Sequence, residues 1–464
     1  MESPSAPSND PPVFRSPLLT RSGSINYSSY LQNEHDAFVE TTNTTSYPSI
    51  EPTASVCSSI MSMILSVIGP GVLAVPYAVA QTGWAAAGIL LLITGCMNML
   101  TLHLNIECAR QLSPHASYSS LCQRTLPRLN IAVDLSVAFT VFGSGCGYLV
   151  VIGDLLPDAV RTIEENHGRE FLEDRRFWIS LMVIVFIFPL VRMKRMDSLR
   201  FTSFISVCCL FFMMFIVILY AFMETLDPCT RHLNYTQSVP LFQSFPVCNG
   251  EIEPFPSDFK GIFKALPVYF MAYAGQFNCS SMVNELRGST RRKLKVINIC
   301  SLTICMVIYS IIGFGAYLTY GNEIDNNILL KYPHSNSLLI LRVAYSISLA
   351  LSYPLTLIPV RKSLSSILFG KNELYNLGWW QFYGITYGVV LASFGVAMSD
   401  LNITHILGFV GSSGIPMIAF VLPGLFYYYF DFGRRGRGFW RYCAILSIVF
   451  GLIFIPFSLT LQFI

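Results

Sequence analysis

Apolar stretches separated by short polar segments recur along most of the chain. Most of them are close to the ~20 residues that a helix needs to cross a bilayer. The pattern predicts an all-α polytopic membrane protein with about eleven transmembrane helices. The expected spans are residues 55–80, 84–106, 131–157, 177–191, 201–223, 262–286, 296–320, 336–360, 379–399, 404–429 and 440–462.

A polar segment rich in Ser, Pro, Thr and Asn precedes the first span. It has too few bulky apolar residues to form a core of its own, so we expect a disordered tail over residues 1–53. Residues 54–464 form the expected transmembrane domain, with one long outer loop at 224–259.

Composition supports a membrane protein and argues against an enzyme. Only 12% of the residues are charged, against about 25% in soluble domains, and the mean hydropathy is +0.53. The sequence contains no zinc-protease, nucleotide-binding or nucleophile-elbow motif, and no Cys/His set with metal-ligand spacing. We therefore expect no catalytic residue, no metal or other cofactor and no nucleic-acid partner. The expected partners are the lipid bilayer and a small molecule, and we expect a monomer.

The distribution of basic residues predicts the orientation. The loops that are inside if the N-terminus is cytosolic hold 19 Lys and Arg residues, against 7 in the loops that are then outside. Positive residues concentrate in cytosolic loops, so the bias predicts a cytosolic N-terminus. The inside loops are residues 107–130, 192–200, 287–295, 361–378 and 430–441.

The long outer loop carries signals of an oxidising compartment. It contains Cys229, Cys248 and the glycosylation sequon Asn234-Tyr-Thr236. A loop on the outer or lumenal side favours a disulfide between the two cysteines and glycosylation of Asn234. Two free cysteines are the alternative.

The first span contains Gly69-Pro70-Gly71-Val72, which cannot continue a regular helix. An unwound segment exposes backbone groups, each of which costs several kcal/mol in hydrocarbon. Such a break survives only where it is buried in protein or lines a polar cavity, so we interpret it as half of a substrate site.

A second break is expected in the sixth span, where Ala274-Gly275-Gln-Phe-Asn278-Cys-Ser-Ser281 is polar at membrane depth. Transporters built from inverted repeats place discontinuous helices at corresponding positions of the two halves. The alternative is a packed interior helix whose small polar side chains satisfy one another.

The two breaks suggest the chemistry of the ligand. Amides from Gly69 to Val72 at the positive end of a half-helix suit a carboxylate, and carbonyls around Ala272 to Gly275 at a negative end suit an ammonium. A zwitterionic amino acid meets both requirements, whereas a sugar would call for carboxylate and amide side chains, which are few in these spans.

Residues for an ion that drives transport are less distinct. Ser348 and Ser352 share one face of the eighth span and, with Ser66 of the first, are candidates for coordinating Na⁺, although small residues also serve helix packing. Asp154, near the outer end of the third span, is a candidate for proton coupling, or a residue of the membrane interface.

Three motifs together resemble the amino acid/auxin permease family, in its branch of sodium-coupled neutral amino acid transporters and vacuolar amino acid transporters. They are Gly69-Pro-Gly71-Val-Leu-Ala-Val-Pro76, Asn284-Glu285-Leu286, and Ser352-Tyr-Pro354 with Pro359-Val-Arg361. The resemblance covers residues 55–464 and implies a leucine-transporter-like fold, with two inverted five-helix repeats and one further helix.

One departure concerns the coupling ion. Sodium-coupled members resemble one another in an asparagine four residues before the first glycine, where this chain has Leu65, and many relatives have a histidine where this chain has Asn278. Coupling to H⁺ is therefore as well supported as coupling to Na⁺.

The sequence predicts a secondary active transporter of small neutral amino acids, with glutamine and asparagine as candidates. It would reside in the plasma membrane or in a lysosomal or vacuolar membrane. The alternatives are an amino acid sensor with little flux and an ion channel, which is disfavoured because no ring-forming selectivity motif is present.

Overall fold

The computed structural model describes residues 52–163, 170–192, 200–222, 251–256, 259–324, 327–333, 335–370, 374, 377–399, 403–430 and 438–462. Within these ranges the chain is helical, and the only β pairing is an isolated parallel bridge between Ala54 and Leu286. The all-α fold class is thereby confirmed.

The helices follow the expected spans closely. They are α2 (Val56–Val67), η1 (Pro70–Leu73), α3 (Val75–Thr82), α4 (Trp84–Leu112), α5 (Tyr118–Thr125), η2 (Pro127–Leu129), α6 (Asn130–Ile163), α7 (Glu170–Glu173), α8 (Arg175–Met182), η3 (Val183–Ile187), α9 (Phe188–Leu190), α10 (Arg200–Phe222), α11 (Phe259–Ala272), η6 (Gln276–Asn278), α12 (Cys279–Glu285), α13 (Arg291–Tyr320), α14 (Ile328–Lys331), α15 (Asn336–Phe369), α16 (Trp379–Ala397), α17 (Ile403–Pro416), η8 (Met417–Val421), α18 (Leu422–Tyr429) and α19 (Phe439–Gln462).

Seven helical segments of the described residues are long and apolar enough to cross a membrane: Trp84–Leu112, Pro127–Arg161, Ser203–Phe222, Arg291–Tyr320, Asn336–Phe369, Gly408–Tyr429 and Phe439–Thr460. The other four apolar runs form interrupted or shorter helices, α2–η1–α3, α8–η3–α9, α11–η6–α12 and α16. The protein is therefore a polytopic membrane protein, and the count of eleven spans stays a prediction.

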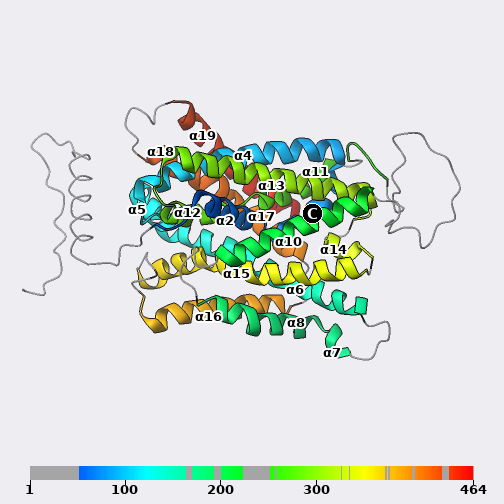
Figure 1. Cartoon of the computed structure of the whole chain (residues 1–464). Coiled ribbons are helices and arrows are strands. Elements are labelled where there is room, and N and C mark those ends of the chain that lie inside the picture. The colour runs from blue at the N-terminus through cyan, green and yellow to red at the C-terminus, as the bar shows by residue number, and fades with distance from the viewer. Residues whose placement is uncertain are drawn as a thin grey trace, which may run out of the picture. The chain divides into compact units, whose positions relative to one another are not determined.

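The long helices pack lengthwise against one another (Figure 1). α6 lies along α15, α15 along α10, and α10 along α13, which also packs on α4. Both halves of the first span, α2 and α3, pack against α13, and α3 also packs against α11. The broken first and sixth spans thus pack against each other, and their interruptions at Pro70–Leu73 and Gln276–Asn278 are buried.

Apolar side chains cover the outer surface of the bundle. On α19, Leu446, Leu452 and Ile453 are more than half exposed, as expected for a helix that faces lipid. Trp379 and Trp380 are exposed at the start of α16, and aromatic rings of this kind anchor helix ends at the membrane–water interface.

The last part of the expected outer loop closes over the start of α4. The carbonyls of Glu253 and Pro254 accept the amides of Trp84 and Ala85, each at 3.0 Å, which satisfies donors that a helix start leaves unpaired. Gly83 turns there with φ +75°, and a Cβ on it would lie 2.8 Å from the Pro254 backbone. Only glycine fits this junction.

Several expectations lie outside the described residues. The tail up to residue 51 is one, and the stretch that contains Cys229, Asn234 and Cys248 is another. The disulfide, the glycosylation and the disordered tail therefore stay predictions.

Candidate functional site

The first-span break is built as the sequence predicts. α2 ends at Val67, Ile68 leaves the helical conformation with ψ 82°, and Gly69 is extended before Pro70 starts the 3₁₀ turn η1. Proline is suited to this first position because it has no amide hydrogen to leave unpaired. α3 then resumes the span at Val75.

Fewer amides are free at this break than the sequence predicts. The Gly69 amide donates to the Val67 carbonyl at 3.0 Å, and the Val72 amide donates to the Gly69 carbonyl at 3.5 Å. Pro70 has no amide hydrogen. Among the described residues, the buried Gly71 amide has no backbone acceptor, so it is the donor of this segment that a ligand can use.

The sixth-span break is shorter than predicted. α11 ends at Ala272, the non-helical link is formed by Tyr273, Ala274 and Gly275, and Asn278 closes the 3₁₀ turn η6. Ser281 lies in the first turn of α12 and not in the unwound segment.

The two breaks contact each other. A Cβ on Gly71 would lie 3.7 Å from the Cα of Ala272, and a Cβ on Gly275 would lie 2.4 Å from a methyl group of Val67. The Asn278 side-chain amide donates to the Ser66 hydroxyl at 2.5 Å. The structure therefore brings together the residues of both predicted segments.

Tyr309 of α13 joins the ends of the two half-helices. Its hydroxyl donates to the carbonyl of Ala272 at 2.5 Å and lies 3.2 Å from the carbonyl of Val67. These are the last residues of α11 and α2, so two negative helix ends converge on one buried hydroxyl.

Two further tyrosines reach Gly69 from the neighbouring helices α6 and α15. The hydroxyl of Tyr148, on α6, would lie 3.1 Å from a Cβ on Gly69, and the hydroxyl of Tyr345, on α15, donates to the Gly69 carbonyl at 3.4 Å. The sequence did not single out these three tyrosines. Only the run of glycines before Tyr148, which lets a neighbour approach, gave a signal.

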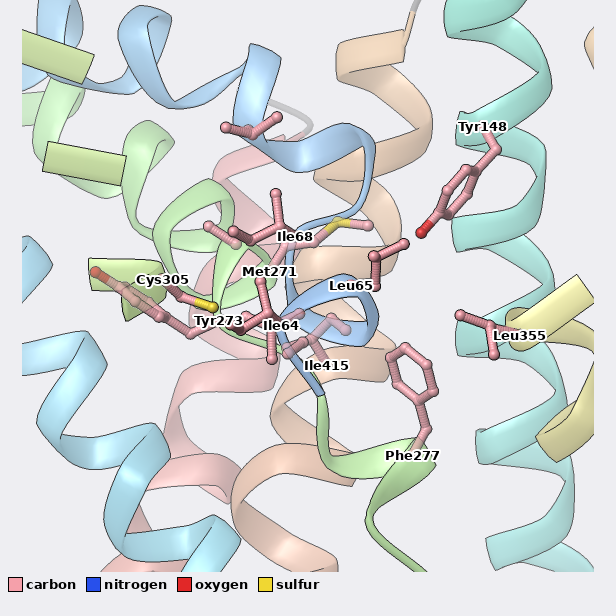
Figure 2. Close-up of a cluster of buried hydrophobic side chains, with 14 of the residues drawn as sticks. Ile64, Leu65, Ile68, Tyr148, Met271, Tyr273, Phe277, Cys305, Leu355 and Ile415 are labelled. Carbon is pink, nitrogen blue, oxygen red and sulfur yellow. The ribbon is translucent and has the colours of Figure 1, made fainter. Parts of the chain in front are cut away.

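Apolar side chains surround the breaks (Figure 2). Ile64, Leu65 and Ile68 come from the first span, Met271 and Phe277 from the sixth, and Tyr148 reaches toward them from α6. The labelled side chains carry no charge. These apolar side chains suit an uncharged ligand side chain, while the polar groups at the breaks come from the backbone and from side chains such as Ser66, Gln276 and Asn278.

A network of amides lies behind the sixth-span break. The Gln276 side chain donates to the Asn98 oxygen at 2.7 Å, and Asn105 donates to the Tyr118 hydroxyl at 2.8 Å. These bonds satisfy part of the polar segment, as in a packed interior helix. The side-chain oxygens of Asn278 and Gln276 and the hydroxyl of Ser280 are nevertheless buried without a hydrogen-bond partner in the described part of the chain.

The candidates for ion coupling bond to different partners. The Ser352 hydroxyl donates to Ser206 of α10 at 3.3 Å, and Ser206 also donates to the Ser348 carbonyl at 3.2 Å. Ser66 accepts from Asn278, as described above. Asp154 forms an ion pair with Arg175 at 3.4 Å, which ties α6 to α8.

An all-helical membrane protein with two discontinuous helices that meet at unpaired backbone groups has the architecture of a membrane transporter. Comparison with known proteins agrees. Residues 52–463 match the family described as transmembrane amino acid transporter protein, and the chain belongs to this family. Its members are transporters rather than enzymes.

The chain is similar to several transporters over most of its length. Vacuolar amino acid transporter 6 of Saccharomyces cerevisiae is 26% identical, over 88% of this chain and 98% of the relative. Vacuolar amino acid transporter 5 of Schizosaccharomyces pombe is 27% identical, over 81% and 84%. Sodium-coupled neutral amino acid transporter 4 of Homo sapiens is 25% identical, over 88% and 84%. The resemblance drawn from the sequence motifs is thereby confirmed.

Proposed function

We propose that this protein is a secondary active transporter of small neutral amino acids, coupled to H⁺ or Na⁺. The observation that carries the proposal is the convergence of the two half-helix ends at Val67 and Ala272, beside the unpaired amide of Gly71.

The backbone groups fit a zwitterion. The carbonyls of Val67 and Ala272, at negative helix ends, match an ammonium, and the Gly71 amide matches a carboxylate. The Tyr148 hydroxyl, close to Gly69, supplies a second donor for the carboxylate. The apolar side chains around the breaks favour a small uncharged side chain, and the amide oxygens of Asn278 and Gln276 keep glutamine and asparagine as candidates.

The transport step follows from where the breaks lie. A substrate held by both broken helices is reached from either side when the first and sixth spans rock against the long helices α6 and α15. The unwound segments give these spans the freedom to bend, since they replace rigid helix by short links.

The proposal leaves two choices of coupling ion, H⁺ or Na⁺, and two kinds of membrane, the plasma membrane or a lysosomal or vacuolar membrane. Some relatives are named as vacuolar and others as sodium-coupled transporters, so either membrane and either ion is compatible with the family. Leu65 supplies no oxygen ligand for Na⁺. The hydroxyls of Ser66, Ser348 and Ser352 and the backbone carbonyls remain oxygen ligands, because a hydroxyl that donates its proton, as Ser352 does to Ser206, keeps its lone pairs. Asp154, which forms an ion pair with Arg175, is the candidate for carrying a coupled proton.

Counterflow in proteoliposomes tests the proposal. Vesicles loaded with one unlabelled neutral amino acid should accumulate the same labelled amino acid transiently, with saturation. Repeating the assay with Na⁺ replaced by choline, at two pH values, identifies the ion. Binding without exchange would replace the transporter by a sensor, and ohmic currents would replace it by a channel.

A further inference from the structure

The Tyr309 hydroxyl is set where the two broken spans come closest. Tyr309 is fully buried, and its ring packs edge-on against Tyr273, with centroids 5.1 Å apart. Its helix, α13, packs against both α2 and α3, which places the phenol beside the first-span break. The hydroxyl bonds the Ala272 carbonyl at 2.5 Å and the Val67 carbonyl at 3.2 Å.

This hydroxyl cannot satisfy both acceptors. A phenol has one proton, whereas an alkylammonium has three and a full positive charge. The unequal distances agree with one good bond and one weak contact. The two carbonyls lie at negative helix ends and share the single proton of the uncharged Tyr309 hydroxyl. An ammonium, with three protons and a positive charge, matches them better.

We propose that Tyr309 is a positioning residue that caps these two carbonyls in the empty protein and gives them up to the substrate ammonium. This inference rests on the proposed transport of amino acids. In the empty protein the cap prevents two buried carbonyls from being left bare, which would be costly in a membrane interior. When substrate binds, its ammonium takes both carbonyls and the phenol turns aside.

The cap has different consequences for two parts of the transport cycle. Substrate must displace the phenol, so the cap weakens substrate binding. The empty carrier must return across the membrane to complete net uptake, and the cap assists that return because it keeps the carbonyls paired. Exchange of internal for external amino acid uses only the loaded carrier and does not need the cap.

Tyr309→Phe removes the hydroxyl and retains the ring that packs on Tyr273. We expect a KM for exchange roughly five-fold lower, the size expected from one net hydrogen bond, and a ratio of net uptake to exchange that falls by a similar factor. A role in folding alone would lower both rates together and leave KM and the ratio unchanged.

Tyr317→Phe is the matched control. Tyr317 lies two turns further along α13, is equally buried, and its hydroxyl accepts the Glu253 amide and donates to Asn322. This substitution also removes one buried hydroxyl, but away from the breaks. We expect its KM and its ratio of net uptake to exchange to match the wild type.

The outcomes separate the cap from the proposed function. If wild-type protein exchanges no amino acid, the proposed function fails. If the wild type exchanges but Tyr309→Phe has an unchanged or higher KM, or an unchanged ratio, the cap is refuted and the transporter stands. Should Tyr309→Phe not reach the membrane, Tyr309→Leu, which also lacks a donor, carries the same comparison. Wild-type behaviour in that variant would refute the cap equally.

Discussion

Gly275 is the position where the contact between the two breaks can be tested most directly. A Cβ there would lie 2.4 Å from a Val67 methyl carbon, while ordinary contacts begin near 3.4 Å, so Gly275→Ala requires the stiff Val67 side chain, or the two spans that carry these residues, to shift by about 1 Å. The backbone does not oppose alanine, because φ is −111°. The effect is therefore one of packing, and overpacking of this kind costs typically 1–3 kcal/mol.

Transport should suffer more than stability. A displacement of about 1 Å at a site that must hold both ends of a substrate can cost about two orders of magnitude in rate. We expect Gly275→Ala to reach the membrane, to lose heat resistance in detergent and to lose nearly all uptake. Gly71→Ala should be milder, since its Cβ would be 3.7 Å from the nearest atom, and Gly384→Ala on α16, with no atom within 4 Å, should be neutral.

A second substitution, at Val67, tests whether the clash with its methyl group causes the loss. Val67→Ala removes the methyl groups that the new Cβ would strike and, alone, leaves a small cavity. The double variant Val67→Ala/Gly275→Ala should therefore lose less stability and less uptake than the sum of the losses in the two single variants. Wild-type uptake in Gly275→Ala, or strictly additive losses in the double variant, would refute the close contact of the two breaks.

Three further predictions concern other contacts of the broken spans. Asn278→Ala and Ser66→Ala should each lower the free energy of unfolding by about 1 kcal/mol. The double variant should be no less stable than either single variant, because the two side chains share one hydrogen bond, and additive losses would contradict this. If uptake depends on sodium, Ser352→Ala should lower the ratio of uptake in sodium chloride to uptake in choline chloride, because the Ser352 hydroxyl donates its proton to Ser206 and keeps its lone pairs for a cation; an unchanged ratio would exclude a sodium site there. Ala54→Cys and Leu286→Cys, combined in a background without other cysteines, should form a disulfide on oxidation without loss of uptake. The backbone bridge between these residues makes the first and sixth spans move as one unit. If oxidation abolished uptake and reduction restored it, the two spans would have to separate during transport.

The sequence was sufficient to locate both breaks. Gly69-Pro70-Gly71 interrupts the first helix, because proline and two glycines cannot continue it at membrane depth, and the structure ends α2 two residues earlier. The polar segment of the sixth span also overlaps its break, which runs from Tyr273 to Asn278 and so begins one residue before the segment and ends three residues before it does. Both cases depend on local chemistry, which a sequence displays directly.

The partners of the breaks could not be predicted in the same way. Tyr309 lies in an apolar run in which a buried tyrosine is ordinary, and its importance comes from two carbonyls that are distant in sequence. Ser348 and Ser352 share a face as predicted, yet the neighbour that decides the direction of their hydrogen bonds is Ser206, on another helix. Packing between helices sets these contacts, and one sequence does not show which helices are adjacent.

The meeting of the two breaks also explains how each is tolerated. An interrupted helix in a membrane leaves carbonyls and amides without partners, and each is costly unless another group pairs with it. Here the two interruptions share their solution, since one tyrosine hydroxyl serves the ends of α2 and α11, and Asn278 bonds Ser66 across the gap. The pairing is incomplete, because the Gly71 amide and the Asn278 oxygen find no such partner in the described structure. A protein that pairs these groups only in part retains polar capacity for a ligand, and a small zwitterion has the donors and acceptors to complete it.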